Sequence, residues 1–375
     1  MTGVLLAHTE LPPHTAELRR AVREFLDGYD FTPRVDSWLS GFDPGFSREL
    51  GARGWLLMTW PRAFGGHERS ALERFVVNEE LLAAGAPVAA HWIADRQSGP
   101  SLLRFGSEEQ QARFLPAIAS GQCFFAIGMS EPGAGSDLSS VTTRARAVEG
   151  GWRITGQKVW TSWAHRAHAI LALVRTAPRG ADRHAGLSQV IVELPSAGVQ
   201  IRPIHGATGE HHFNEVSFDD AFVPQSRVVG EVGQGWTQVT SELAYERSGA
   251  ERYLSVFCLV RAFAVTAGAA DRRVLADAVA RMRILRQAGL SIAGALDRGE
   301  RPDVAAALVK DAGTAFEQDI VESIRAAAGV EADPDSADNL ARMLAQAAVA
   351  MPGFTLRGGS TDVLRSMVAR DLGLR

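Results

Sequence analysis

Apolar residues recur every three or four positions through the first third of the chain. The pattern is clearest in residues 18–26 and 72–82, where one face of a helix would be apolar and the opposite face polar. Ser70 followed by Glu73 has the spacing of a capping box, in which each residue satisfies a free backbone N–H at the start of a helix. These patterns predict a helical N-terminal domain over residues 1–120.

The period of the apolar pattern shortens over residues 121–228. Short apolar runs there are separated by Gly, Pro or Asp-rich segments, which is typical of strands joined by turns. Several runs at close spacing predict a small β domain, built as a barrel or as packed sheets. The runs are FFAIGM, TTRARAV, GWRITGQKVW, HAILALVRT, LSQVIVELP and NEVSFDDAFVP.

The helical period returns after this β region. Residues 271–300, 303–330 and 336–351 form long, Ala-rich amphipathic stretches. Long antiparallel helices joined by short loops pack as a bundle. We therefore expect an α+β protein whose helical N-terminal domain and small β-barrel domain are followed by a C-terminal four-helix bundle over residues 229–375.

Composition and charge exclude several classes of function. Of the 375 residues, 46% are hydrophobic and 22% are charged, as in ordinary globular proteins. The formal net charge is -4, and the basic residues are spread along the chain rather than clustered. Neither a nucleic acid nor a membrane surface is therefore expected as a partner.

The N-terminus and the cysteines bear on the cellular compartment. The opening MTGVLLAHTELPPH lacks the basic start and the apolar core of a secretory signal, and no apolar run has membrane-spanning length. Cys123 and Cys258 lie far apart in sequence and suggest neither a disulfide framework nor a thiolate metal site. We expect a cytoplasmic protein.

A stretch poor in side chains stands at the start of the β region. Residues 128–137 read GMSEPGAGSD, in which three small residues lie between Glu131 and Asp137. The chain here lacks the G-K-[ST] of a phosphate-binding loop, and no G-x-G-x-x-G opens a helix. The stretch is therefore expected to be a rigid loop that lets a large ligand approach the backbone closely.

Four stretches, in this order, resemble the motifs of the acyl-CoA dehydrogenase family of flavoproteins. The resemblance implies the three-domain fold, with FAD between the β domain and the C-terminal bundle. It implies the conversion of an acyl-CoA to a 2-enoyl-CoA, with an electron-transfer flavoprotein or another acceptor taking the electrons, and so a place in lipid metabolism. The stretches are MSEPGAGSD, GWRITGQKVWTS, FDDAFVP and the closing RGGSTDVLRSMVARDLGLR.

The resemblance assigns flavin contacts to the first two stretches. Met129 and Ser130 would flank the flavin ring, while Trp160 and Ser162 would cover its face and hydrogen-bond its edge. Trp160 could instead be an ordinary core aromatic residue, because tryptophan is commonly used that way.

Further contacts are implied for the closing stretch and for the Gly-rich loop. Ser360 and Asp362 match positions beside the diphosphate and adenosine of FAD, although a carboxylate next to a phosphate is repulsive unless a water or cation intervenes. Ser136 would face the cofactor and the pantetheine arm of the substrate, or it would cap its own turn through its hydroxyl. Asp137 is expected to tie down its own loop.

The catalytic base departs from the usual pattern of the family. The reaction needs a carboxylate that abstracts the α-proton of the thioester in a water-poor pocket. Most members carry this base where Gly358 stands here, whereas a minority carry it on a mid-chain helix, at the position of Glu246. We expect Glu246 to be the base, Arg247 to contact the substrate, and the Gly358 N–H to bind the thioester carbonyl. The alternatives are a structural ion pair for Glu246 and a surface role for Arg247.

A second departure concerns the subunit interface. The family usually carries an Arg-x-x-Phe-Gly stretch that reaches the FAD of a neighbouring subunit, and AVTAGAADRRVLADAV lacks it. Arg272 or Arg273 could substitute, or a different partner subunit could complete the site, as the resemblance to actinobacterial heteromeric steroid-side-chain dehydrogenases allows. A homo-oligomer or a heterotetramer is expected.

Two other functions are compatible with the sequence, whereas a metal site is not indicated. The fold could act on an acyl thioester of an acyl carrier protein in a biosynthetic pathway, or the chain could be a non-catalytic subunit of a heteromeric dehydrogenase. A metal site at the GEHHFNE stretch is not expected, because adjacent residues of an extended chain point to opposite faces. The possible ligands there are Glu210, His211, His212 and Glu215.

Overall fold

A computed structural model describes residues 6–207, 209–246 and 249–374 of the chain. The chain divides into two compact units, each made of separate segments of the sequence. We call them the helical unit (Met1–Asp43, Glu68–Ala89 and Glu246–Arg375) and the sheet unit (Pro44–His67 and Ala90–Tyr245).

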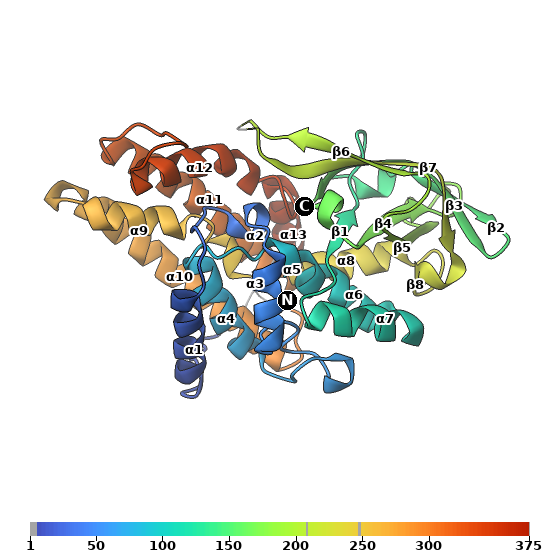
Figure 1. Ribbon diagram of the computed structural model, residues 1–375, viewed down its shortest axis with the longest axis horizontal. Coiled ribbons are helices and arrows are strands. Elements are labelled where there is room, and N and C mark those ends of the chain that lie inside the picture. The colour runs from blue at the N-terminus through green and yellow to red at the C-terminus, as the bar shows by residue number, and fades with distance from the viewer. Residues whose placement is uncertain (1–5, 208, 247–248, 375) are drawn as a thin grey trace. The chain divides into compact units, whose positions relative to one another are not determined.

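The helical unit is built around the long helices α10 and α11, which lie beside each other (Figure 1). Gly313 on α11 allows a close approach, since a Cβ there would stand 2.1 Å from the carbonyl oxygen of Arg252. The elements are α1 (Thr15–Gly28), α2 (Ser37–Ser40), α4 (Ala71–Ala83), η6 (Ala250–Arg252), α9 (Phe257–Thr266), η7 (Ala269–Asp271), α10 (Arg272–Asp297), α11 (Asp303–Ala327), α12 (Asn339–Phe354) and α13 (Thr361–Asp371).

The predicted capping box at the start of α4 is confirmed. The Ser70 hydroxyl accepts a hydrogen bond from the Glu73 N–H at 3.1 Å, and the Glu73 carboxylate accepts one from the Ser70 N–H at 2.9 Å. One apolar face of the helix, including Leu72, Phe75 and Val76, is buried. The helical spacing of these residues therefore predicted both the helix and its buried face.

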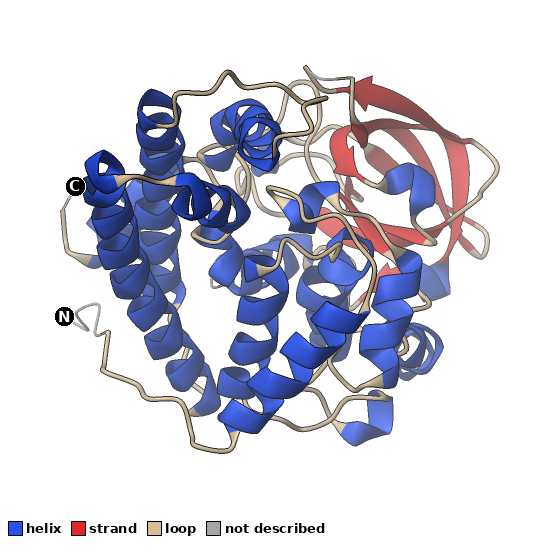
Figure 2. Ribbon diagram, turned by 60° about the vertical axis from the view of Figure 1, so that its left-hand side comes forward, coloured by secondary structure: helices blue, strands red, loops and turns tan. Residues whose placement is uncertain are grey.

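The sheet unit contains one eight-stranded sheet, drawn in red in Figure 2. The strand order is β6-β7-β3-β2-β4-β5-β8, and β1 pairs in parallel with β4. The strands are β1 (Phe125–Gly128), β2 (Arg144–Val148), β3 (Gly151–Ser162), β4 (Ala169–Arg175), β5 (Leu187–Glu193), β6 (Val199–His205), β7 (His211–Pro224) and β8 (Val228–Val229). The other elements are α3 (Pro44–Ala52), η1 (Arg62–Phe64), α5 (Ala89–Ile93), η2 (Ala94–Ser98), α6 (Gly99–Phe105), α7 (Glu108–Ala119), η3 (Leu138–Ser140), η4 (Ala164–Arg166), η5 (Gln225–Arg227) and α8 (Gly235–Glu246).

Strand β4 is buried on both faces and separates two apolar clusters. Ile170 and Ala172 pack among residues of the sheet itself. Ala169 and Leu171 alternate with them and pack with residues of α6 and α7. A strand covered on both sides reads as a continuous apolar run, which is why AILALV stood out in the sequence.

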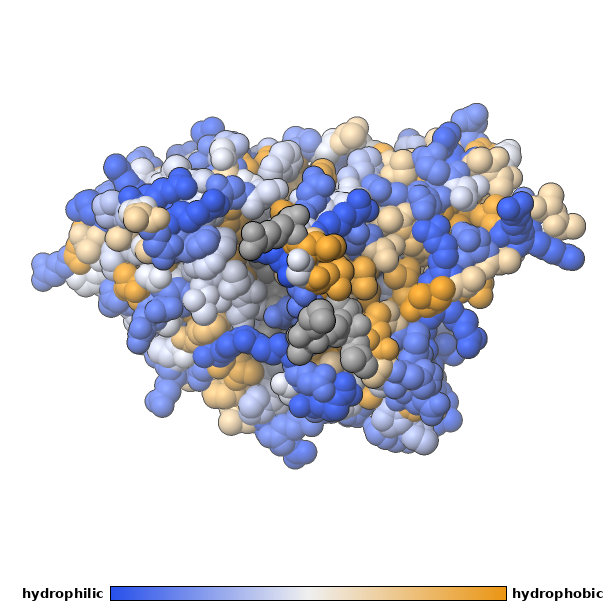
Figure 3. Space-filling view, turned by 180° about the vertical axis from the view of Figure 1, so that it is seen from behind, coloured by the Kyte–Doolittle hydropathy of each residue, from blue (hydrophilic) through white to orange (hydrophobic). Residues whose placement is uncertain are grey.

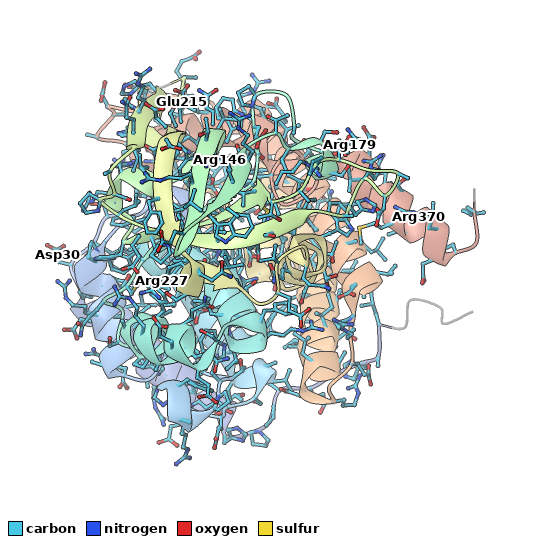
Figure 4. The ribbon with its side chains drawn as sticks, turned by 90° about the vertical axis from the view of Figure 1, so that its right-hand side faces the viewer. Asp30, Arg146, Arg179, Glu215, Arg227 and Arg370 are labelled. Carbon is cyan, nitrogen blue, oxygen red and sulfur yellow. The ribbon has the colours of Figure 1, made fainter. Side chains whose placement is uncertain are left out.

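Arg227, labelled in Figure 4, links strand β5 to helix α7. Its guanidinium donates to Glu193 of β5 at 2.6 Å and to Glu109 of α7 at 2.7 Å. Arg113 of α7 forms a second ion pair with Glu193. These contacts fix α7 against the sheet.

The expected α+β fold, helical at both ends and β in the middle, is confirmed. The molecular face in Figure 3 is largely hydrophilic, with smaller hydrophobic areas between the polar residues. In the described part of the chain, every helix is too short or too polar to span a membrane.

Candidate functional site

The first acid of the Gly-rich stretch points into the protein. Glu131 is 6% exposed, and its backbone closes a tight turn by exchanging hydrogen bonds with Ala134. Its carboxylate accepts hydrogen bonds from the backbone N–H of Thr142 at 2.7 Å and of Thr143 at 2.9 Å. It also accepts one from the Lys158 ammonium at 2.8 Å. Glu131 therefore holds the loop in place.

Lys158 joins this loop to strand β3. Its side chain is fully buried, and Nζ also donates to the Met129 carbonyl oxygen at 3.1 Å. Burial opposes ionisation of Glu131, but Lys158 and the threonine hydrogen bonds outweigh it and lower the Glu131 pKa to about 2. Burial lowers the Lys158 pKa to about 8, against the attraction of Glu131. The pair is charged at neutral pH.

The two stretches assigned to flavin binding lie side by side. The Val159 N–H donates to the Ser130 carbonyl oxygen at 2.9 Å, one residue before Trp160. Met129 is buried in an apolar cluster with Val141 and Leu173. The structure thus brings Met129 and Ser130 next to the strand that carries Trp160 and Ser162.

Trp160 is exposed, so the alternative of a core aromatic residue is wrong. Its side chain is 58% exposed, and its φ is 59°, in the left-handed region that bulky residues avoid. The pairing of β3 with β7 shifts register between Lys158 and Thr161, which produces this local backbone. The ring meets Phe213 edge-on, with 5.8 Å between centroids. An exposed, strained tryptophan offers one flat face to a ligand.

Asn214 of β7 fixes the end of β3. Its amide donates to the Thr161 carbonyl oxygen at 3.0 Å, and its Oδ1 bonds with His165 at 3.1 Å and with His211 at 2.8 Å. The two imidazoles stack at 3.9 Å. Burial, His211 and Arg166 lower the His165 pKa. These contacts position Ser162, which pairs with Phe213.

The GEHHFNE stretch supplies part of this network. His211 bonds Asn214, whereas the His212 ring lies against Phe213 at 4.2 Å. Glu215, labelled in Figure 4, lies on β7 and accepts from Ser217 at 3.5 Å. Within residues 6–207, 209–246 and 249–374, no three His, Cys, Asp or Glu side chains are grouped to hold a metal ion.

The second acid of the Gly-rich stretch ties down its own loop, as expected. Asp137 accepts hydrogen bonds from the hydroxyls of Ser139 at 2.6 Å and Ser140 at 2.5 Å. These bonds lower its pKa to about 2. Arg183 forms an ion pair with it.

The outer side of the same loop is open. A Cβ at Gly133 or Gly135 would meet no other atom within 4 Å, and neither glycine has a positive φ. Ser136 is exposed, and its hydroxyl has no hydrogen-bond partner among the residues that the structure describes. The backbone alone does not require small residues here, and the open side leaves room for a ligand.

The second group of candidate residues lies in the helical unit, at the turn before α13. Gly358 has φ 66° and Gly359 has φ 95°, which L side chains rarely adopt. Lys310 of α11 is fully buried, and its Nζ donates to the Gly359 carbonyl oxygen at 2.7 Å. Ser360 is the residue just before α13, and Asp362 is exposed in the first turn of that helix.

A buried polar network holds Arg357, the residue before this turn. Its guanidinium binds both carboxylate oxygens of Asp36, at 2.7 Å for Oδ1, and stacks on Trp38 at 4.4 Å. The Asp36 N–H donates to the Ser255 carbonyl oxygen at 2.7 Å, and the Ser255 N–H donates to Glu317 at 2.7 Å. Burial raises the Glu317 pKa to about 8, with Asp36 adding to the effect and Arg357 opposing it.

The predicted base is only partly described. Glu246 is the last residue of α8, and its side chain lies outside the described structure, as does the whole of Arg247. Arg272 and Arg273 are exposed in the first turn of α10. Their assignments stay predictions.

The residues that hold the two turns were not predicted from the sequence. The chain has only two lysines, Lys158 and Lys310, and each donates from the interior to a backbone carbonyl of a motif. Because the chain uses arginine at every other Lys or Arg position, its two lysines could have been singled out from the sequence as candidates for a special role. The Asp36–Arg357 pair spans most of the sequence and had no local signal.

Comparison with known proteins shows the family to which the chain belongs. Residues 12–122 match the family model of the acyl-CoA dehydrogenase N-terminal domain, and residues 126–221 match that of the acyl-CoA dehydrogenase middle domain. The chain is 34% identical over 347 residues to the acyl-CoA dehydrogenase IpdE1 of Mycolicibacterium smegmatis, which covers 88% of this chain and 87% of that protein. It is 44% identical over 202 residues to IpdE1 of Mycobacterium tuberculosis, and this alignment spans about half of each protein (54% and 52%).

Two solved structures are similar over almost the whole length. The Tcur3481-Tcur3483 steroid ACAD has a TM-score of 0.87 and 31% identity, covering 98% of this chain and 99% of that chain. The ChsE4-ChsE5 complex from Mycobacterium tuberculosis has a TM-score of 0.83 and 29% identity, with the same coverage of 98% and 99%.

Proposed function

Because the chain belongs to the acyl-CoA dehydrogenase family of oxidoreductases, which act on CH–CH groups, we propose that it catalyses the FAD-dependent α,β-dehydrogenation of an acyl thioester. The observation that carries the proposal is the exposed Trp160 beside Met129 and Ser130. A flat, neutral ring system such as a flavin suits an exposed indole face and a backbone free of side chains.

The residues of the sheet unit fit FAD. Trp160 would cover one face of the flavin ring, and Ser130 and Ser162 would hydrogen-bond its polar edge. Ser136 would face the cofactor and the pantetheine arm with its unpartnered hydroxyl. In the helical unit, Ser360 would donate to the diphosphate from the N-terminus of α13, which favours anions. Bound FAD would supply the acceptor for the β-hydrogen.

A side chain of the protein would accept the α-proton of the thioester. Glu246 at the end of α8 would accept the α-proton as general base, with Arg247 beside the substrate. The Gly358 N–H would donate to the thioester carbonyl oxygen, where negative charge develops as the α-proton leaves. Lys310 and Arg357 hold the backbone on either side of Gly358, so they would keep this N–H in a fixed direction.

The comparisons support a choice of substrate and partners to test. The similarity to a steroid ACAD favours a steroid-derived acyl-CoA, and an electron-transfer flavoprotein is a suitable acceptor. The similarity to a two-component complex favours assembly with a second chain as well as with its own copies. We also propose that the domain boundaries lie near residues 120 and 228. The protein would act in the cytoplasm.

A non-catalytic subunit is the second candidate. The observation that favours it is Gly358 itself, which has no carboxylate at the usual position of the family's base. This chain would then bind FAD or stabilise a partner without turning over a substrate.

The deciding experiment measures anaerobic bleaching of bound flavin by a panel of acyl thioesters. Glu246→Gln keeps the size of the side chain and removes the proton acceptor, so flavin should stay bound while the bleaching rate falls at least ~10²- to 10⁴-fold. Recovery of bleaching in Glu246→Gln with Gly358→Glu would indicate that both positions reach one α-carbon. Bleaching of Glu246→Gln at the native rate would reject Glu246 as the base, and absence of bleaching in the native protein with every thioester would favour the non-catalytic subunit.

A further inference from the structure

A groove of about 610 Å³ lies within the helical unit, between α1, α4, α9 and α10. These four helices are neighbours in Figure 1. The volume falls in the range of small-molecule sites. The lining residues are Arg19, Arg23, Leu26, Asp27, Glu79, Glu80, Ala83, Ala84, Tyr253, Leu254, Phe257, Arg261, Val279, Met282, Arg283 and Arg286.

One residue of the lining, Tyr253, has a buried hydroxyl without a partner among the described residues. Tyr253 is 1% exposed, and its Oη makes no hydrogen bond with the residues that the structure describes. Burial raises the Tyr253 pKa well above its ordinary value, so the phenol keeps its proton and acts as a donor. Gly289 packs closely beside this ring, because a Cβ at that position would stand 3.0 Å from Phe75 and 3.6 Å from the Tyr253 Oη. An unsatisfied buried donor points to an acceptor supplied by a ligand.

Two of the three carboxylates that line the groove are neutralised by ion pairs. Arg286 binds Glu79 at 2.5 Å, and Arg23 binds Glu80 at 2.6 Å. Arg19 contacts both carboxylates, at 2.7 Å for Glu79. These three arginines neutralise Glu79 and Glu80, and Asp27 is the remaining carboxylate of the lining.

Two guanidinium groups of the groove have no ion-pair partner among the described residues. Arg261 on α9 and Arg283 on α10 are exposed, and neither forms an ion pair or a side-chain hydrogen bond within residues 6–207, 209–246 and 249–374. Five arginines and three carboxylates line the groove, which leaves a net positive charge of two. Apolar side chains such as Phe257 and Met282 form the rest of the lining.

We propose that this groove binds a free carboxylic acid whose apolar body carries an oxygen acceptor, such as a hydroxyl or keto group. The carboxylate binds Arg261 and Arg283, the apolar body lies on Leu254, Phe257 and Met282, and the distal oxygen accepts the Tyr253 hydroxyl. Guanidinium groups suit a carboxylate because of their planar, paired donors. The residues that line the groove include none of those assigned to flavin and thioester binding.

The test uses titration calorimetry of the full-length protein with ω-hydroxydodecanoate, dodecanoate and dodecanol. The native protein should bind the hydroxy acid more tightly than dodecanoate, and dodecanol most weakly. Arg261→Gln with Arg283→Gln should weaken both acids about tenfold or more, because two charge-assisted contacts are lost. Arg301→Gln, an exposed arginine outside the groove, is the matched control and should bind as the native protein does.

Tyr253→Phe separates the hydroxyl from the packing of the ring. It should weaken the hydroxy acid about fivefold, to the level of dodecanoate, and leave dodecanoate unchanged. The fold should persist, since the change removes an unpaired buried polar atom. No binding by the native protein, or undiminished binding by the double arginine variant, would overturn the site. An unchanged affinity of Tyr253→Phe for the hydroxy acid would overturn the assignment of its distal oxygen.

Discussion

At the scale of single residues, motifs that look alike in sequence divide into structural and ligand-facing parts. In the Gly-rich stretch, Glu131 binds Lys158 of β3 and Asp137 binds the hydroxyls of its own loop, while Ser136 is exposed and the glycines beside it have open space around them. In the next stretch, Lys158 is buried and Trp160, two residues later, is exposed. The side chains with internal partners hold the backbone that presents the others.

Replacing Trp160 tests the flavin-face assignment. Trp160→Ala should weaken FAD binding about tenfold, since one stacked face is lost, while the free energy of unfolding of the apoprotein should change by less than about 0.5 kcal/mol because the side chain is exposed. Flavin absorbance after gel filtration measures the retention. Trp160→Phe keeps a flat ring and is the control; full flavin occupancy in the alanine variant would reject the assignment.

Replacing Lys158 tests the buried pair. Lys158→Met leaves the Glu131 carboxylate buried without its cation, so the free energy of unfolding should fall by about 3 kcal/mol, measured by urea denaturation. Lys158→Met with Glu131→Gln removes both charges and should recover part of the loss. If the double variant is as unstable as the single one, the ion pair is not what stabilises the loop.

At the scale of elements, local patterns predicted the helices and strands, whereas long-range contacts escaped prediction. The capping box at Ser70 and the apolar run of β4 are encoded within a few residues, and both are confirmed. Asp36 and Arg357 are separated by 321 residues, so nothing near either one reveals the pair. The exposure of Trp160 arises from a register shift between two strands, which depends on the partner strand as much as on its own sequence.

The network around α11 should make stability depend on pH. The Glu317 pKa is raised from 4.5 to about 8, so between these pH values the unfolded chain releases the proton while the folded protein keeps it. The free energy of unfolding therefore falls as pH rises through this window. Glu317→Gln retains an acceptor for the Ser255 N–H and does not titrate. The free energy of unfolding of the variant minus that of the native protein should therefore increase from pH 5 to pH 8.

Urea denaturation of both proteins at the two pH values measures this difference. Glu331→Gln, a change of an exposed glutamate, serves as the control and should leave the pH dependence of the native protein unaltered. A difference between Glu317→Gln and the native protein that stays constant over this range would show that Glu317 does not carry the effect.

At the scale of the whole molecule, exposed apolar side chains on the long helices favour association. Val265 on α9 is 87% exposed, and Ile284 on α10 is 69% exposed. Apolar side chains gathered on neighbouring helices are typical of surfaces buried between subunits. We expect a dimer or tetramer by light scattering, and Ile284→Lys should weaken association about tenfold by burying an unpaired charge. A stable, flavin-loaded and active monomer would contradict the expectation.

The two lysines have a consequence for the chemistry of the intact surface. Both ammonium groups are fully buried, so every exposed cationic side chain of the described fold is an arginine or a histidine. Reagents that acylate primary amines should therefore label the native protein at its α-amino group alone, provided that this group is free. Lysines 158 and 310 should react only when the fold opens. A protease that cleaves after lysine would likewise cut only the opened chain, at two sites that each report on the turn its own lysine secures.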